Sequence, residues 1–404
     1  MAAFLITGFL GIGDYWWSWG DLIFRWLHVV AGIAWIGSSF YFIALDNHLE
    51  PPADPNDAAR GVGGEVWEIH GGGFYQIEKF KVAPERLPEK LHWFKWEAYA
   101  TWLSGFSLLV VVYFAHASTF LVDRSVADLS TWEAIAIAVG GLVLAWAVYD
   151  TLCRLLGRND PALAVAVLGF VVLAAWGSAQ LLAARAAYIE VGAMLGTIMA
   201  ANVFFVIIPA HWKIVRAKEA GEAPDPAWNA RGKQRSVHNN YLTLPVVFAM
   251  LSNHFPFTYG HRHAWLILVA LMALGAWLRH YFNLRHKGRN AWWIPVSAAA
   301  GLLAVAVVIR PASSASNTSG PAPAFATVQA IVANRCAPCH SLTPTEPGYS
   351  APPAGIALDT AAEIAQAAPL IRSAAVDSHA MPLGNATGMT QAERDTLARW
   401  LASR

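Results

Sequence analysis

Two cysteines and a histidine stand close together near the C-terminal end of the chain, in the run Cys336-Ala337-Pro338-Cys339-His340. With this spacing the two thiols can form thioethers with the vinyl groups of a haem, and the imidazole can serve as the proximal iron ligand. A disulfide, half of a zinc site or a thioredoxin-like redox pair would use the same residues. Zinc requires a second pair of ligands and the redox pair requires a βαβ context, and the sequence offers neither. We therefore predict one covalently attached c-type haem.

A methionine that follows the attachment motif is the predicted sixth iron ligand. Met381 has the distance and setting typical of a small cytochrome c, and Met/His ligation raises the reduction potential of a haem. Met389 and His379 are rivals for this role. Met389, however, directly precedes a helix start, because Thr390 and Glu393 have the spacing of a capping box. We therefore predict that Met381 completes the coordination of the iron.

The composition is that of a membrane protein. Of 404 residues 56% are hydrophobic and only 14% are charged, and the chain contains 19 tryptophans. The net charge is +1 and no basic block occurs, so the sequence predicts no nucleic-acid partner. The third cysteine, Cys153, lies in an apolar run and is interpreted as a buried thiol.

Apolar segments of about 20 residues, the length that crosses a bilayer, can be counted eight times. They are residues 21–45, 97–121, 131–153, 161–184, 187–210, 237–258, 263–282 and 291–310. The loops on one side of this arrangement carry 17 Lys and Arg residues, and those on the other side carry three. The positive-inside rule then places the N-terminus and everything after residue 310 outside the cytoplasm. Bacteria attach c-type haem on that side, so we expect a multi-pass protein of the bacterial inner membrane with a periplasmic haem domain.

These segments predict an all-α fold, in which a polytopic membrane helical bundle precedes a small all-α c-type cytochrome domain. Residues 1–310 form the integral membrane domain, with a cytoplasmic insertion at 46–96 that contains a hairpin around Trp67 to Phe80. Residues 311–324 are small or proline and predict a flexible linker. Residues 325–404 form the predicted cytochrome domain.

Polar side chains inside the spans are costly in lipid and therefore informative. One group falls in the outer third of the bundle and predicts a catalytic pocket near the haem, with an arginine to bind an anion and other groups to accept protons. Each residue alone could instead bond between helices or reach towards the membrane surface. The group consists of Arg25, His28, His116, Glu190, Asn253 and His254.

A second polar group lies at the inner ends of the spans, and reaching towards the cytoplasm accounts for most of it. It consists of His211, His238, Asn239, Asn240, Arg279 and His280. Histidine pairs in the membrane domain could also hold b-type haem. His238 and His254 lie about 24 Å apart on one predicted helix, a separation that suits two haems.

Three stretches of the membrane domain resemble the membrane-bound bacterial urate hydroxylase family, also called cytochrome c urate oxidase. They are residues 20–32 (GDLIFRWLHVVAG), 65–72 (EVWEIHGG) and 92–97 (HWFKWE). The resemblance implies oxidation of urate to 5-hydroxyisourate without peroxide. Electrons would pass to the fused haem and then to a cytochrome c or a terminal oxidase. The haem residues of the family correspond here to Cys336, Cys339, His340 and Met381.

The chemistry of urate suits the predicted pocket. Urate is a monoanion at neutral pH, so Arg25 is a reasonable anchor. The oxidation of urate releases two electrons, whereas one haem accepts one electron at a time. The haem must therefore be reduced and reoxidised twice per urate, or a second redox centre must be present. A membrane-tethered electron carrier or a quinol-oxidising subunit are the competing hypotheses. A simple anchor should tolerate Arg25→Ala and His116→Ala, whereas an enzyme should lose turnover.

Overall fold

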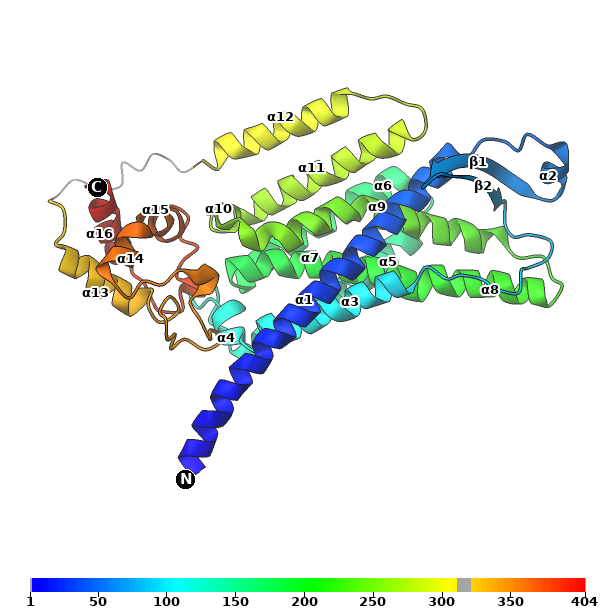
Figure 1. Cartoon of the computed structure of the whole chain (residues 1–404). Coiled ribbons are helices and arrows are strands. Elements are labelled where there is room, and N and C mark those ends of the chain that lie inside the picture. Colours follow the sequence, from blue (N-terminus) through cyan, green and yellow to red (C-terminus); the bar gives the residue numbers. More distant parts are fainter. Residues whose placement is uncertain (1, 311–320, 404) are drawn as a thin grey trace.

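The computed structural model describes residues 2–310 and 321–403, and in this part the chain is mostly helical. A long bundle forms the body of the molecule, a small helical domain packs at one end, and a β-hairpin projects at the other (Figure 1). The bundle and its insertion comprise α1 (Ala2–His48), α2 (Pro55–Ala59), β1 (Val62–His70), β2 (Gly73–Phe80), α3 (Trp96–Leu108), α4 (Ala117–Phe120), α5 (Thr131–Leu156), α6 (Asp160–Leu181), α7 (Ala184–Ala201), α8 (Ile208–Glu219), α9 (Pro226–Leu251), α10 (Pro256–Tyr259), α11 (Ala264–Arg285) and α12 (Trp293–Val308). The small domain comprises α13 (Phe325–Arg335), α14 (Ala361–Gln366), α15 (Ala368–Ile371) and α16 (Gln391–Ala402).

Six helices of the described chain are long and apolar enough to cross a membrane, which supports six of the eight predicted spans. They cover Trp16–His48, Trp96–Phe114, Thr131–Leu156, Asp160–Leu181, Ala184–Glu219 and Ala264–Arg285. The other two predicted spans are helical but do not meet these criteria. Helix α12 is apolar but has only 16 residues, and α9 carries many polar side chains. Which side of the membrane each end faces stays a prediction.

Two of the long helices are locally underwound into π-helix. Leu109–Phe114 extends α3, and Asn202–Ile207 joins α7 to α8. Such turns often occur at functional sites, because the extra residue redirects the neighbouring side chains. Here the first turn contributes to a cavity described below, and the second places Asn202 in a buried polar network.

The inner polar group does not simply reach towards the membrane surface, and this part of the sequence-based interpretation is wrong. Asn239, Asn240 and Arg279 are buried. The Nδ2 of Asn202 donates to the side-chain oxygen of Asn239 at 2.9 Å, and the Nε of Arg279 donates to that of Asn240 at 2.9 Å. These side chains face other helices because amides and a guanidinium gain partners there that lipid cannot supply.

The other three members of the inner group are less buried. His238 shares a hydrogen bond of 2.7 Å with the Tyr149 hydroxyl, and His280 shares one of 2.7 Å with Tyr241. His211 is exposed and lies beside the Trp93 ring. The hydroxyl contact therefore occupies one ring nitrogen of His238.

A buried ion pair anchors the same network. The Nη2 of Arg235 donates to Asp150 at 2.7 Å, and both side chains are largely buried. The Nε of Arg154 donates to the other carboxylate oxygen of Asp150 at 2.7 Å. Removing one partner of a buried pair leaves the other charge desolvated and unpaired, which costs about 3–5 kcal/mol.

We therefore expect Asp150→Ala to lower the thermal unfolding temperature of the detergent-solubilised protein strongly. The matched control is Thr151→Ala, one residue further along α5, where the side chain is exposed and bonds only to its own helix. Adding Arg235→Leu to Asp150→Ala should recover part of the loss, because the unpaired charge is then gone. Equal unfolding temperatures for Asp150→Ala and Thr151→Ala would contradict a stabilising role for this pair.

The predicted hairpin in the first long loop is confirmed. Strands β1 and β2 pair antiparallel over Val62–His70 and Gly73–Phe80. Gly71 and Gly72 form the turn and both have positive φ, which glycine adopts without strain.

The small domain has its own hydrophobic core. Val328 and Val332 of α13 pack with Ile364 of α14 and Leu397 of α16, and each of these side chains is almost fully buried. The capping box predicted before the last helix is present, because Thr390 and Glu393 bond to each other's backbone N–H groups. Of the predicted linker 311–324, residues 311–320 lie outside the described chain.

The small domain packs closely against the end of the bundle where α4 and α10 lie (Figure 1). Gly348 and Gly384 have positive φ, and a Cβ at either position would lie 2.9 Å from a bundle atom, in His116 and Val122 respectively. Leu383 is buried among apolar side chains of the bundle. At these two glycines the backbone of the small domain lies so close to the bundle that a side chain would not fit between them. The loop 378–385 is therefore held against the bundle.

Candidate functional site

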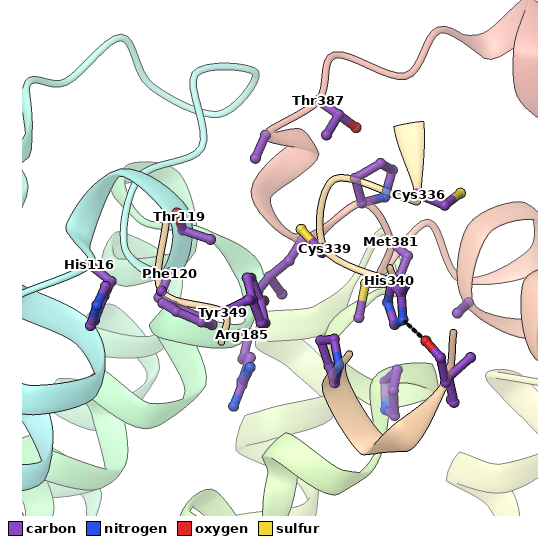
Figure 2. A pocket seen from close by; sticks show the side chains of 18 of the residues that line it. His116, Thr119, Phe120, Arg185, Cys336, Cys339, His340, Tyr349, Met381 and Thr387 are labelled. Carbon is purple, nitrogen blue, oxygen red and sulfur yellow. Dashed lines mark hydrogen bonds between the residues drawn. The ribbon is translucent and has the colours of Figure 1, made fainter. Parts of the chain in front are cut away.

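A cavity of about 590 Å³ lies where the small domain meets the bundle. Figure 2 shows Cys336, Cys339, His340 and Met381 on one side of it, and His116, Phe120, Arg185 and Tyr349 on the other. The cavity is therefore shared between the attachment motif and residues of the helical bundle.

The attachment motif follows directly from the end of α13. Cys336 caps this helix, and the backbone N–H groups of Cys339 and His340 both bond to the Cys336 carbonyl, at 3.1 and 2.8 Å. This tight turn brings both cysteines and the histidine to the cavity wall. The two cysteines form no disulfide.

Both thiols differ from those of a reactive redox pair. Burial raises the pKa of the Cys336 thiol to about 12 and that of the Cys339 thiol to about 11. Thioredoxin-like pairs work through a thiolate with a lowered pKa. The environment therefore does not favour the redox-pair interpretation.

The imidazole of His340 is held in one orientation. Its Nδ1 donates a hydrogen bond of 2.9 Å to the carbonyl of Ile356 (Figure 2). A histidine that ligates a metal typically donates its other ring nitrogen in this way, which fixes the ring and leaves Nε2 free.

Among the three candidates for the sixth ligand, the structure places only Met381 at this cavity. Its backbone carbonyl accepts a hydrogen bond of 2.8 Å from the buried Arg394, which holds the loop in place. Met389 is buried in the core of the small domain, where it also borders a second cavity. His379 lines that second cavity and not the first.

The remaining lining of the small-domain side suits a flat apolar macrocycle. It includes Ile356, Leu358, Ile371 and Leu383. Two thiols at the attachment spacing, an oriented imidazole, a thioether and apolar walls together form a donor set that fits a c-type haem. Arg335 and Thr387 also line the cavity and could meet polar substituents of such a group.

We expect the predicted haem to stay covalently bound in Met381→Ala but to have a lower reduction potential, because it would lose a thioether ligand that raises the potential. Met389→Ala removes a side chain of the same size and serves as the control. Haem staining after denaturing electrophoresis would detect covalent attachment, and a redox titration would give the potential. An equal shift in both variants, or an unchanged potential in Met381→Ala, would contradict this assignment.

On the bundle side, the predicted catalytic residues are only partly brought together. His116 lines the shared cavity, where its Nδ1 donates to the Val111 carbonyl at 3.2 Å and its ring meets Trp17 edge-on. Arg25 also lines this cavity, but it is exposed and its guanidinium is paired with Asp21 at 2.5 Å.

A further cavity of about 420 Å³ lies within the bundle, between α1, α3, α7 and α9. Arg25, His28, Asn253 and His254 all line it. His28 donates from Nδ1 to the Thr101 carbonyl at 2.9 Å. Four of the six predicted pocket residues therefore share this cavity, whereas His116 faces the neighbouring one.

Glu190 lies apart from both cavities. It is buried in α7 and faces Gly141 of α5, where a Cβ would lie 2.9 Å from the carboxylate oxygen. That oxygen, Oε1, has no hydrogen-bond partner among the described residues. The rotation of α7 directs Glu190 towards α5, so this residue does not share the predicted pocket.

The sequence-based interpretation missed Arg185, which it treated as a loop residue between two spans. Arg185 is the second residue of α7, and it lines both cavities described above as well as the one bordered by His379. Its Nε donates to the Asn253 side-chain oxygen at 2.9 Å. The signal in the sequence was a single arginine within the otherwise apolar run that joins the fourth and fifth predicted spans.

The fold and the site define a polytopic helical protein whose bundle shares a cavity with a small domain that carries a haem-attachment motif. The family described as Urate oxidase N-terminal matches residues 14–310, and the chain belongs to it. This membership makes the protein a urate-related oxidoreductase, and the matched residues end before the small domain. No curated protein and no solved structure matches the chain.

Proposed function

We propose that the protein is a membrane-bound urate hydroxylase, which converts urate and water to 5-hydroxyisourate with release of two protons and two electrons. The electrons pass, one at a time, to a c-type haem on Cys336 and Cys339, with His340 and Met381 as its axial ligands. They then leave to a cytochrome c or a terminal oxidase of the respiratory chain, and no peroxide is formed. The bundle spans the inner membrane, with the haem domain on the periplasmic side.

The shared cavity is the observation that carries this proposal. The family match covers the bundle, which supports urate chemistry there, and the attachment motif lies in the small domain. Arg25 and Arg185 line both the cavity that holds the motif and the cavity inside the bundle. A substrate bound near these arginines would therefore lie close to the electron acceptor.

The chain supplies binding, orientation and proton transfer. Cationic side chains hold the urate anion, and charge-assisted hydrogen bonds make this binding stronger than neutral ones would. His28, His116 and His254 border the cavities and can accept the protons that urate and the attacking water release. When bound, the haem supplies a one-electron oxidant, so two electron transfers complete each reaction.

A quinol-oxidising subunit is the second candidate. The apolar character of the cavity inside the bundle favours it. Its walls are mostly apolar, with Ile33, Phe106, Leu109 and Val246 among them. Such a site would suit the ring and the first part of the tail of a quinol.

We expect anaerobic urate to reduce the haem of the oxidised purified protein, with about two haems reduced per urate when the protein is in excess, since urate gives two electrons. The absorption of the haem gives the extent of reduction, and hypoxanthine, which lacks the anionic charge at neutral pH, is the control. With oxygen and an electron acceptor present, no peroxide should accumulate. A haem that stays oxidised with urate but is reduced by a quinol would favour the second candidate.

A further inference from the structure

Arg185 lies at the point where three cavities meet. It lines the cavity of the attachment motif, the cavity inside the bundle, and a third of about 330 Å³ that also borders His379, Arg394 and Asp123. In Figure 2 its side chain lies beside Phe120 of the bundle and Tyr349 of the small domain. A ligand that enters any one of these cavities can reach the guanidinium.

The guanidinium of Arg185 contacts the Phe120 ring, but its charge is not neutralised by an acidic side chain of the described residues. Within the described part of the chain no carboxylate pairs with it, whereas Arg25 is paired with Asp21. Its one side-chain hydrogen bond runs from Nε to Asn253, so the Nη atoms keep their donors. A half-buried guanidinium without a counter-ion favours an anionic ligand, because desolvation makes an unpaired charge costly.

The surroundings suit a planar ligand. The guanidinium carbon lies 5.7 Å from the centre of the Phe120 ring, and the Phe120 and Tyr349 rings lie 5.6 Å apart. The Asn253 oxygen also accepts from Tyr113 at 3.4 Å, which fixes the amide next to the arginine. Helix α7 begins at Ala184, so the positive end of its dipole adds to the attraction for an anion.

We propose that Arg185, oriented by Asn253, is the anchor that binds the oxopurine monoanion, and that Arg25 is not. This inference rests on the proposed function for the identity of the ligand. The planar fork of Arg185 would meet the oxygen and nitrogen acceptors along one edge of the anion, and the neighbouring aromatic rings would cover its face. The bound anion would then lie between the bundle and the attachment motif.

The test is direct binding of radiolabelled urate to the full-length holoprotein by equilibrium dialysis. The haem is first reduced with dithionite under anaerobic conditions, so that urate binds without being oxidised. We expect Arg185→Gln to raise the Kd for urate by about 10- to 100-fold, the loss of one or more hydrogen bonds to a charged group. Arg185→Lys keeps the charge but not the fork, and its Kd should fall between those of the wild type and Arg185→Gln.

Arg262→Gln is the matched control, because Arg262 is an exposed arginine in a loop at the same end of the bundle and lines none of the three cavities. Its Kd should equal that of the wild type, and all variants should keep the haem content and spectrum of the wild type.

An unchanged Kd in Arg185→Gln would overturn the inference, and so would a larger loss of urate affinity in Arg25→Gln than in Arg185→Gln. If the wild type binds urate in dialysis but urate does not reduce the oxidised haem in the separate anaerobic test, the proposed function is contradicted and the subsite stands. A wild type that binds no urate would overturn the subsite.

A separate observation concerns the hairpin, which folds back along α1 towards the bundle. Glu65, near the base of β1, pairs with Glu50, just after the end of α1. Glu68, nearer the tip, accepts a hydrogen bond of 2.7 Å from Tyr41, about two turns inside α1. The tip therefore points back along a helix that is long and apolar enough to cross the membrane (Figure 1).

One face of this tip is apolar and uncovered. Trp67 and Ile69 alternate along β1, and Phe74 pairs with Ile69, so all three share the face opposite Glu68. Their exposed fractions are 62%, 69% and 76%. We infer that this face lies in the interfacial layer of the bilayer, where aromatic side chains are enriched. We assign the lipid surface as the partner of this face because the tip returns to the level of the α1 span. The base of the hairpin, in contrast, is charged, and its Lys79 pairs with Asp46.

Spin labels on full-length protein in lipid nanodiscs test this placement. Ile69→Cys and Phe74→Cys, in a Cys153→Ala background, should be more accessible to oxygen than to a water-soluble nickel chelate. Glu89→Cys, in the exposed part of the same insertion, should show the reverse order. Greater nickel accessibility at the tip would overturn the inference. Exclusion of both reagents together with spin–spin broadening would overturn it in favour of contact with a second copy.

Discussion

The close contact between the small domain and the end of the bundle is the constraint on which the site depends. Its tightest points are glycines, where any side chain would collide with the opposite part. Gly384 lies against the Val122 carbonyl, and Gly260 at the end of α10 would place a Cβ 2.4 Å from the Ser378 carbonyl. Because these contacts flank Met381, the loop that carries the predicted iron ligand is also the loop that touches the bundle. A group attached to Cys336 and Cys339 would thereby be held near the bundle instead of moving freely on a linker.

This contact also explains why two arginines that line the same two cavities differ in their surroundings. Arg25 lies on the exposed side of α1 and pairs with Asp21, one turn earlier on the same helix. Exposed pairs of this kind contribute little energy and leave the cation screened. Arg185 lies under the small domain, where less water reaches it and where an amide orients it without neutralising it. The same residue type is thus a surface ion pair in one place and an available anion site in the other.

The two ends of the bundle are built in opposite ways. At the end away from the small domain, Asp150, Arg235, Asn202 and Asn239 bond to one another, and a polar network of this kind holds helices together in lipid. At the end that contacts the small domain, polar side chains border cavities, and Arg185 keeps unused donors. The network around Asp150 is therefore suited to fixing the helices, and the polar group near the small domain is suited to binding a ligand. Glu190 belongs to neither, since its carboxylate is buried between α5 and α7 without a partner for one oxygen.

Local patterns in the sequence determined much of this protein. The spacing of Cys336, Cys339 and His340 predicts the haem site because attachment needs only neighbouring residues, and apolar runs predict the membrane-length helices because the bilayer sets their length. The hairpin and the capping box at Thr390 follow from equally local rules. Tertiary structure alone decided which side chains meet. The rotation of α7 turned Glu190 away from the pocket, helix packing buried Asn239, Asn240 and Arg279, and docking of the small domain brought Arg185 to the junction of the cavities. Helix rotation and domain docking depend on contacts between residues far apart in the chain, and the period of a single helix carries no record of them.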